Sequence, residues 1–260
     1  MKLLILLFVA LTMNAFAQPQ LYEGNDLFDA QKYHSAIPIY KRAFTKKATF
    51  EAAYKLGLSY QNIGESIEAE NWLTRAIEID TSSADCFLAL GNALKENGKY
   101  AAAKYHFQRA ASMDVNLQIS LRKKIAFCDS SIVWNKLSSV NDIQSLKYGN
   151  TANSEFSPIF YKNAIYFSSD RSEIDKERKE MNQETGSAYL GIFTASLVDS
   201  GFHDIAPVVI GTEPFLYHEA TCSFATKSDT LYFSSVRKDD LIPDKLNELD
   251  IYLSLIHIWR

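Results

Sequence analysis

The sequence predicts a multidomain chain of the α-then-β class, in which stacked helical hairpins are followed by an incomplete set of antiparallel β-sheets. Three observations predict this fold. Small residues recur every 33 or 34 positions in the first half, the hydrophobic period changes after Leu137, and a second repeat with an offset of 66 follows. The 260 residues are 47% hydrophobic and 22% charged, which allows one large domain or two modest ones.

Residues 1–17 have the pattern of a signal peptide. Met1-Lys2 is a short positive start, residues 3–11 are an apolar run, and residues 15–17 read Ala-Phe-Ala, the small-x-small form of a cleavage site. The apolar run is short for the alternative, a membrane anchor of about 20 residues. We therefore expect the mature chain to begin at Gln18 and to be exported, into a periplasm.

Charge and cysteine content exclude several classes. The 27 basic and 31 acidic residues give a net charge of −4, which argues against a nucleic-acid partner bound through general electrostatics. Cys86, Cys128 and Cys222 are too few and too scattered for a disulfide framework. Cys86 and Cys128 lie in helical patterns where they could approach one another, but small buried hydrophobic residues are the favoured interpretation.

Three copies of a helical pattern follow. Gly24, Gly57 and Gly91 are each followed, twelve and nineteen residues later, by an alanine, with a bulky residue between the two alanines. The alanines are Ala36, Ala43, Ala69, Ala76, Ala103 and Ala110, and the bulky residues are Tyr40, Leu73 and Phe107. Small residues let the helices of one hairpin approach closely, and we expect the bulky residue to fill the gap against the next hairpin.

This pattern resembles the tetratricopeptide repeat, a 34-residue helix–turn–helix, in three copies over residues 18 to about 117. Gly64 and Gly98 end the first helices of the second and third copies. Gln31 occupies this place in the first copy, so we expect that turn to be less regular.

Residues 117–137 predict one more amphipathic helix, which would cap the solenoid and complete a helical domain over residues 18–137. A free-standing amphipathic membrane helix is the alternative. The apolar residues available for burial are Ile119, Ile125, Phe127, Val133 and Trp134.

The resemblance implies a peptide groove lined by the first helices of the hairpins. The candidate groove residues are Asn25, Phe28, Tyr54, Gln61, Asn92 and Lys95. Four acidic residues share the inward positions with the single lysine: Asp29, Glu51, Asp85 and Glu96. This charge balance is unsuited to the C-terminal carboxylates that some family members bind, so we expect a neutral or basic protein segment. In the alternative, the groove only packs against the second domain of the same chain.

Residues 138–150 are polar and predict a linker, and residues 151–252 have the alternating apolar pattern of strands. Residues 156–158 and 164–171 match residues 222–224 and 230–237, both with an offset of 66. A further strand follows each copy, at residues 190–195 and 249–253. The hairpin turns are expected at residues 162–163 and 227–229.

The order of motifs in this part of the chain resembles the WD40-like (TolB-type) propeller repeat. That order is Ser-Pro, a hairpin, Tyr-Phe-Ser-Ser-x-Arg, and then a strand similar to Asp-Ile-Tyr. The resemblance implies an incomplete β-propeller, because residues 151–252 supply at most two blades and a closed ring needs about four to eight. Residues 253–260 match what a sequencing adapter encodes when read in frame, so we expect this segment to replace the natural C-terminus.

No catalytic residue, cofactor or metal site is expected from the sequence. Three charged residues of the β part are expected to pair within or between blades and to fix loops: Asp170, Arg171 and Arg237. Three polar residues lack the close spacing of metal ligands: His203, His218 and Glu219. No Gly-rich phosphate loop and no Gly-x-Ser-x-Gly motif is present.

The domain order resembles the N-terminal part of OmpA-family envelope proteins, some of which belong to the type IX secretion apparatus. The resemblance implies a non-enzymatic periplasmic scaffold at the outer membrane, with other envelope proteins as partners of the groove and propeller. Peptidoglycan would be bound only by a missing C-terminal domain. The alternatives are the N-terminal part of an exported serine peptidase with a propeller, and a TolB-like accessory of a transport complex.

Overall fold

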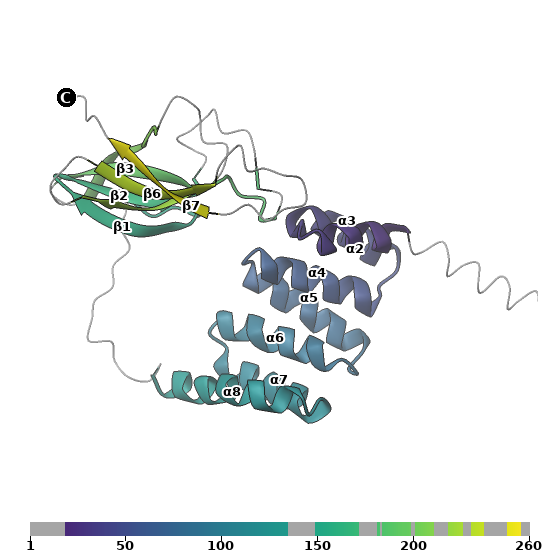
Figure 1. Ribbon diagram of the computed structural model, residues 1–260. Helices are drawn as coiled ribbons and strands as arrows, with labels where there is room; N and C mark the ends of the chain where they lie inside the picture. The colour runs from purple at the N-terminus through teal and green to yellow at the C-terminus, as the bar shows by residue number, and fades with distance from the viewer. Residues whose placement is uncertain are drawn as a thin grey trace, which may run out of the picture. The chain divides into compact units, whose positions relative to one another are not determined.

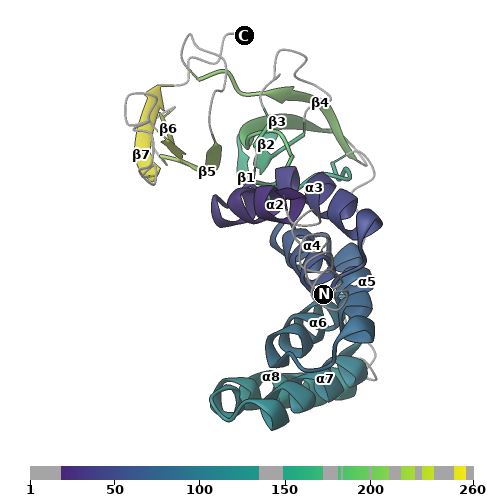
Figure 2. The same ribbon diagram turned by 90° about the vertical axis from the view of Figure 1, so that its right-hand side faces the viewer.

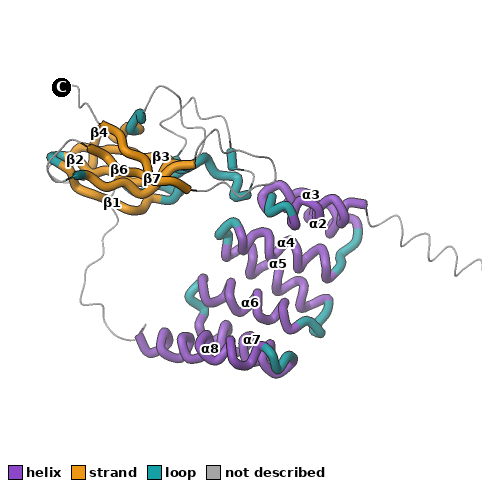
Figure 3. The backbone as a smooth tube through the Cα atoms, in the orientation of Figure 1, coloured by secondary structure: helices purple, strands orange, loops and turns teal. Residues whose placement is uncertain are grey.

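The chain divides into two compact units, a helical one and a β one, each described here by itself. Figures 1 and 3 show the helices and strands of a computed structural model. The predicted signal peptide, residues 138–148 of the predicted linker, and residues 256–260 lie outside the described residues. The structure describes residues 19–134, 149–171, 181–182, 184–198, 201–210, 218–225, 230–236 and 249–255.

Seven helices form the helical unit within the described residues. They are α2 (Pro19–Asp29), α3 (Tyr33–Lys46), α4 (Phe50–Asn62), α5 (Ser66–Ile79), α6 (Ala84–Glu96), α7 (Tyr100–Met113) and α8 (Leu117–Trp134). Three hairpins, α2–α3, α4–α5 and α6–α7, stack in chain order, and α8 packs on α7 (Figure 2). Side-chain caps begin α4 and α6, where Thr49 and Ser83 accept hydrogen bonds from the amides of Ala52 and Cys86.

The glycines of the repeat lie against the bulky residue of their own hairpin. A Cβ atom on Gly24 would lie 2.7 Å from the Tyr40 ring, and one on Gly57 or Gly91 would lie 2.6 Å from Leu73 or Phe107. Tyr40, Leu73 and Phe107 are fully buried. Each of these side chains therefore lies directly on the facing helix of its own hairpin, because the missing Cβ leaves room for it.

All three hairpins turn with the same hydrogen bonds. The amide of residue 31, 64 or 98 donates to the carbonyl three residues back, and the next amide donates five residues back, which is a Schellman motif. Gln31 has a φ of +58°, beside +83° for Gly64 and +72° for Gly98. The expectation of a less regular first turn was wrong, because Gln31 adopts the left-handed conformation that glycine adopts without strain.

Helix α8 repeats the burial pattern of the first helices. Leu121 and Cys128 lie one repeat length after Phe87 and Leu94, and all four are buried. Ile125 is partly buried against the core, but the other residues predicted for burial, Ile119, Phe127, Val133 and Trp134, are exposed. That part of the prediction was wrong because, among the described elements, α8 packs mainly on α7, which covers only part of its surface.

The β unit contains two antiparallel sheets. The first has the order β1 (Glu155–Tyr161), β2 (Ala164–Ser169), β3 (Gly191–Val198) and β4 (Gly201–Pro207), and the second has β5 (Glu219–Phe224), β6 (Thr230–Val236) and β7 (Leu249–Leu255). One face of the first sheet packs on the second, with Ile192, Leu231 and Phe233 in the shared core. Strand β7 pairs with β6 as far as Leu255, three residues beyond the predicted boundary, because main-chain pairing does not depend on side-chain identity.

The structure corrects the alignment of the β repeat. Strands β2 and β6 are related by the predicted offset, since Ile165 pairs with Phe160 and Leu231 pairs with Phe224. The same pairs place Phe160 of β1 and Phe224 of β5 in equivalent positions. The offset between β1 and β5 is therefore two positions shorter than the offset between β2 and β6, because the connection from β5 to β6 is two residues longer than the connection from β1 to β2. The single constant offset in the sequence alignment did not anticipate this difference. Both first strands bulge at equivalent residues with positive φ, Ser157 and Thr221.

We predict that Gly91→Ala lowers the free energy of unfolding by about 1–3 kcal/mol, because its Cβ would overlap the Phe107 ring. Urea unfolding followed by circular dichroism measures this change. In a Phe107→Ala background the same substitution should cost little, because the overlapping ring is gone. An equal loss in both backgrounds would contradict the packing described here.

We predict that Gln31→Gly raises the free energy of unfolding by about 1 kcal/mol, because glycine adopts the left-handed conformation without strain. The reciprocal Gly98→Gln should lower it by a similar amount, since open space surrounds Gly98 and only the backbone conformation is penalised. Thermal unfolding of both variants beside the parent chain provides the comparison. Shifts in the same direction would show that the turn conformation does not set these energies.

Candidate functional site

The six predicted groove residues lie on the first helices of the three hairpins. Two are on α2, two on α4 and two on α6, and all six are partly exposed. We call the surface they form the first-helix surface: Asn25, Phe28, Tyr54, Gln61, Asn92 and Lys95. Hydrogen bonds of Asn25, Gln61 and Asn92 and a cation–π contact of Phe28 link α2, α4, α6 and α8 in a row.

Asn25 connects the core of the first hairpin to this surface. Tyr40, whose ring lies on Gly24, donates from its hydroxyl to Asn25 Oδ1 at 2.7 Å. The Asn25 amide nitrogen then donates to Glu51 Oε1 on α4 at 3.2 Å. Burial, followed by the charges of Asp29 and Glu51, raises the pKa of Tyr40 well above its ordinary value, so its proton stays in place. Asn25 is therefore held in one orientation.

Aromatic side chains continue the row onto α4. The Lys55 ammonium lies 4.1 Å from the centroid of the Phe28 ring, a cation–π contact between α4 and α2. Tyr54 stacks on Phe50 with ring centroids 5.5 Å apart. Burial, then the charge of Asp85 on α6, raises the pKa of Tyr54 to about 12. Tyr54 therefore remains a neutral phenol next to a carboxylate.

The remaining candidates link α4, α6 and α8. Gln61 donates to the carbonyl of Ala89 at 3.4 Å, and the Lys124 ammonium on α8 donates to Asn92 Oδ1 at 2.6 Å. The Lys95 ammonium lies 5.9 Å from the centroid of the Phe127 ring, also on α8. Helix α8 therefore extends the first-helix surface beyond the three predicted repeats.

Sequence reasoning missed two lysines of this surface. Lys55 and Lys124 contact the candidate residues Phe28 and Asn92, so the predicted balance of four acidic residues against one lysine is incomplete. A signal for Lys124 exists in the sequence. It lies two repeat lengths after Leu56 and one after Leu90, at the position where the second and third repeats bury leucine.

The charged residues of the first sheet have structural partners. Arg171 is buried, donates to Glu155 at 3.0 Å and to the carbonyl of Gly149 at 2.8 Å, and lies over the Phe167 ring. Burial alone raises the pKa of Glu155, but hydrogen bonds from Thr151 and the charge of Arg171 hold it below its ordinary value.

Asp170 accepts a hydrogen bond from the amide of Ser154 at 2.7 Å, which ties a neighbouring loop. The prediction that Asp170 and Arg171 fix loops is therefore confirmed, whereas Arg237 lies outside the described residues.

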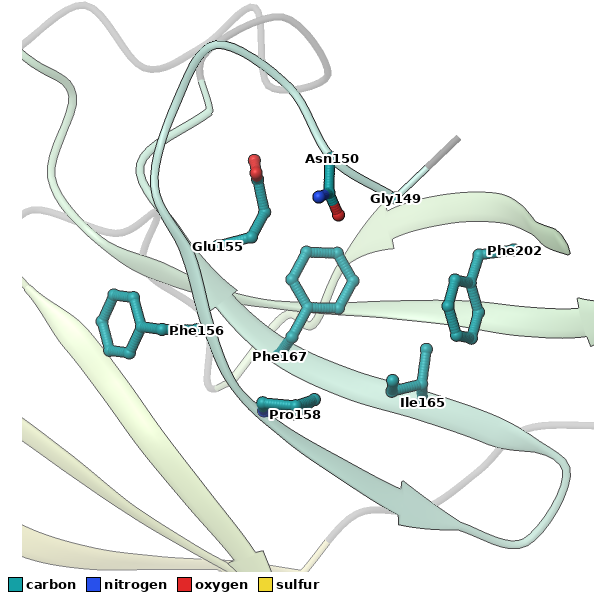
Figure 4. A pocket seen from close by; sticks show the side chains of 8 residues that line it. All are labelled: Gly149, Asn150, Glu155, Phe156, Pro158, Ile165, Phe167 and Phe202. Atoms are coloured by element: carbon teal, nitrogen blue, oxygen red, sulfur yellow. The ribbon is translucent and has the colours of Figure 1, made fainter. Parts of the chain in front are cut away.

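A small pocket lies beside the ion pair of Arg171 and Glu155 (Figure 4). Its volume is about 120 Å³, and its apolar floor includes Ile165, Phe167 and Phe202. Asn150 and Glu155 are its polar lining residues. Ligand sites for small molecules are commonly about 300–1,000 Å³. The pocket has room for a single apolar side chain, and Glu155 is already bound to Thr151 and Arg171.

His218, Cys86 and Cys128 have structural contacts or lie buried. His218 accepts a hydrogen bond from the amide of Leu190 at 3.1 Å, and its second ring nitrogen lies 3.0 Å from the Asn182 amide. The part of the chain that the structure describes contains no cluster of three potential metal ligands. Cys86 and Cys128 are free and buried, which confirms the favoured interpretation of these two cysteines. Burial raises the pKa of Cys86 to about 12, so its reactive thiolate is suppressed.

In a comparison with known protein families, one segment of the chain matches a repeat family. Residues 50–83 match the model of the tetratricopeptide repeat. No curated protein sequence matches the chain. None of the described helices meets the length and apolarity needed to cross a membrane.

Three solved structures illustrate what the helical unit is similar to. The second tetratricopeptide domain of human RPAP3, in complex with an HSP70 peptide, is 25% identical and covers 44% of this chain and 94% of its own, with a TM-score of 0.41. The Sgt2 domain from Aspergillus fumigatus is 17% identical and covers 52% and 91%, with a TM-score of 0.42. The Yersinia enterocolitica chaperone SycD, in complex with a YopD peptide, is 12% identical and covers 44% and 92%, with a TM-score of 0.41. The family match at residues 50–83, with the glycine geometry shared by all three hairpins, supports tetratricopeptide repeats in the helical unit.

Proposed function

We propose that this chain is a non-enzymatic interaction scaffold that binds an extended segment of another protein along its first-helix surface. One observation carries the proposal: the side-chain hydrogen bonds of Asn25, Gln61 and Asn92 link α2, α4, α6 and α8 in series. Preformed helical surfaces suit this task because little conformational entropy is lost when a partner docks. The family match at residues 50–83 agrees with a protein ligand, since the resemblance implies a peptide groove on the first helices.

The charges at one end of the row favour a neutral or basic segment. Asp29 and Glu51 both act on Tyr40, and Asp85 acts on Tyr54, so three carboxylates converge around α2, α4 and the start of α6. A lysine or arginine of the ligand would compensate these charges. Tyr54 and Phe28 offer aromatic faces on which the aliphatic or cationic part of such a side chain can lie.

The proposed location is the periplasm, in association with the outer membrane. This rests on the export pattern of residues 1–17 and on the resemblance of the domain order to OmpA-family envelope proteins. Envelope proteins would then be the partners, a role in type IX secretion is one setting, and peptidoglycan would be held only by a domain beyond this chain.

The β unit fits the proposed incomplete propeller. Tyr232, Ile251 and Leu253 on the outer face of the second sheet are 41%, 81% and 58% exposed. The register places Tyr232 and Ile251 at the positions that Tyr166 and Ile192 occupy in the first sheet. There the second sheet covers both residues, to 8% and 0% exposure. By the same repeat, a third sheet would cover the outer face of the second.

Selection from a random dodecapeptide library tests the proposed binding. The full chain should retain peptides enriched in lysine and arginine, and the double variant Glu51→Gln/Asp85→Asn should lose this enrichment by about tenfold, because two ligand-facing charges are removed. Glu65→Gln, on an exposed turn outside the row, is the matched control. Preference for acidic tails without basic residues, or no retention of any peptide, would overturn the proposal.

Sequencing the natural gene across the codons for residues 250–260 tests the proposed architecture. We expect further Tyr-Phe-Ser-Ser-x-Arg repeats and then an OmpA-like domain, because the outer face of the second sheet needs a cover. A Gly-x-Ser-x-Gly motif followed by Asp and His would instead identify a peptidase. A reading frame that ends soon after Leu255 would contradict the third sheet.

A further inference from the structure

Helix α8 carries a row of apolar residues on the side away from its core contacts. Ile119, Ala126 and Val133 are seven residues apart, which places them on one line along the helix, and all three are exposed. Leu121 and Cys128, which α8 buries, lie on the opposite side. Because α8 ends the stack and contacts mainly α7, this row lies outside the packing of the described helices (Figure 2).

The exposed apolar area of this row is unusual for a helix packed in a solenoid. Ile119 is 77% exposed and Val133 is 57% exposed, and Trp134, which follows Val133 at the end of the helix, is 58% exposed. Single exposed apolar residues are common in proteins, whereas a contiguous row of them marks an interaction surface.

Two basic residues border the apolar row. Arg122 and Lys123 lie three and four residues after Ile119, one on each side of the row, and both are exposed. Neither forms an ion pair with the residues that the structure describes. Asp129, the single acidic residue of α8, is held by Lys104 of α7 at 2.6 Å. The border of the row therefore keeps its positive charge.

A negatively charged lipid surface matches this combination better than a second copy of the chain does. Apolar residues and tryptophan, flanked by arginine and lysine, are typical of helices that lie in the interface of anionic bilayers. Long basic side chains can reach lipid phosphates while the helix stays at the interface. Two-fold pairing of this face with itself would instead bring Arg122 and Lys123 of both copies together, and like charges repel.

We propose that the outward face of α8 binds the surface of an anionic lipid bilayer. This face consists of Ile119, Arg122, Lys123, Ala126, Val133 and Trp134. The inference goes beyond the proposed function, because Lys124 and the rest of the first-helix surface lie on another side of α8 and stay available to a protein ligand. The scaffold would thus lie reversibly on a membrane while it holds its partner.

Vesicles of phosphatidylcholine alone, and of an equal mixture of phosphatidylcholine and phosphatidylglycerol, test this binding with the full chain. The readout is the emission of Trp134, obtained as the difference between the spectra of the parent chain and of Trp134→Phe. We expect this emission to shift to shorter wavelength with the anionic vesicles alone, and salt should reduce the shift. Because the readout is local to α8, binding of residues 1–17 to lipid does not imitate it.

A pair of charge variants tests the role of the basic border. Arg122→Gln/Lys123→Gln should weaken binding to the anionic vesicles by about tenfold, since each basic residue near an anionic surface contributes to the affinity. Arg42→Gln/Lys46→Gln removes the same charge from exposed positions of α3 and is the matched control, which should bind as the parent chain does. Circular dichroism checks that each variant is folded.

Three results would overturn the inference. They are an unchanged Trp134 spectrum with anionic vesicles, equal shifts with both kinds of vesicle, and equal losses of binding in the two charge variants. A dimer in sedimentation without lipid that Ile119→Ser/Val133→Ser abolishes would also overturn it, by assigning the face to a second copy. Retention of basic peptides is measured separately, so each of these results leaves the proposed function intact.

Discussion

The close approach of the two helices in each hairpin is the constraint on which the helical unit depends. Gly24, Gly57 and Gly91 have no Cβ, so a buried tyrosine, leucine or phenylalanine lies directly against the backbone of the facing helix. The residue after the first and the third of these glycines, Asn25 or Asn92, belongs to the first-helix surface. Packing in the core therefore sets the spacing of these surface residues.

Helix α8 shows how the same pattern ends. It keeps the buried positions of a first helix at Leu121 and Cys128 but has Ile125 where the repeats have glycine. A second helix can no longer approach at that point, and Lys124 takes the position where Leu56 and Leu90 are buried. An ammonium is tolerated there because it lies over the Phe107 ring and donates a hydrogen bond to Asn92.

The β unit depends on a different kind of interaction. Each sheet has one face that packs on a neighbour, and the first sheet also holds a buried arginine against Glu155 and the carbonyl of Gly149. An ion pair of this kind is costly to break, because removal of one partner leaves a buried charge uncompensated. It therefore fixes the segment before β1 on the sheet, and the charged residues serve architecture rather than chemistry.

Much of this architecture followed from the sequence alone: the three hairpins, the glycine and alanine spacing, the change of period and the equivalence of β2 with β6. These features are local, since a periodic pattern and a turn residue act within a few positions of one another. The tertiary structure alone decided the left-handed Gln31, the exposed apolar face of α8, the shifted offset of the first strands in the β repeat and the lysines of the first-helix surface. Apart from Gln31, whose turn closes through local hydrogen bonds, these features depend on contacts between residues far apart in the chain, such as Lys124 with Asn92, whose distance no sequence spacing specifies.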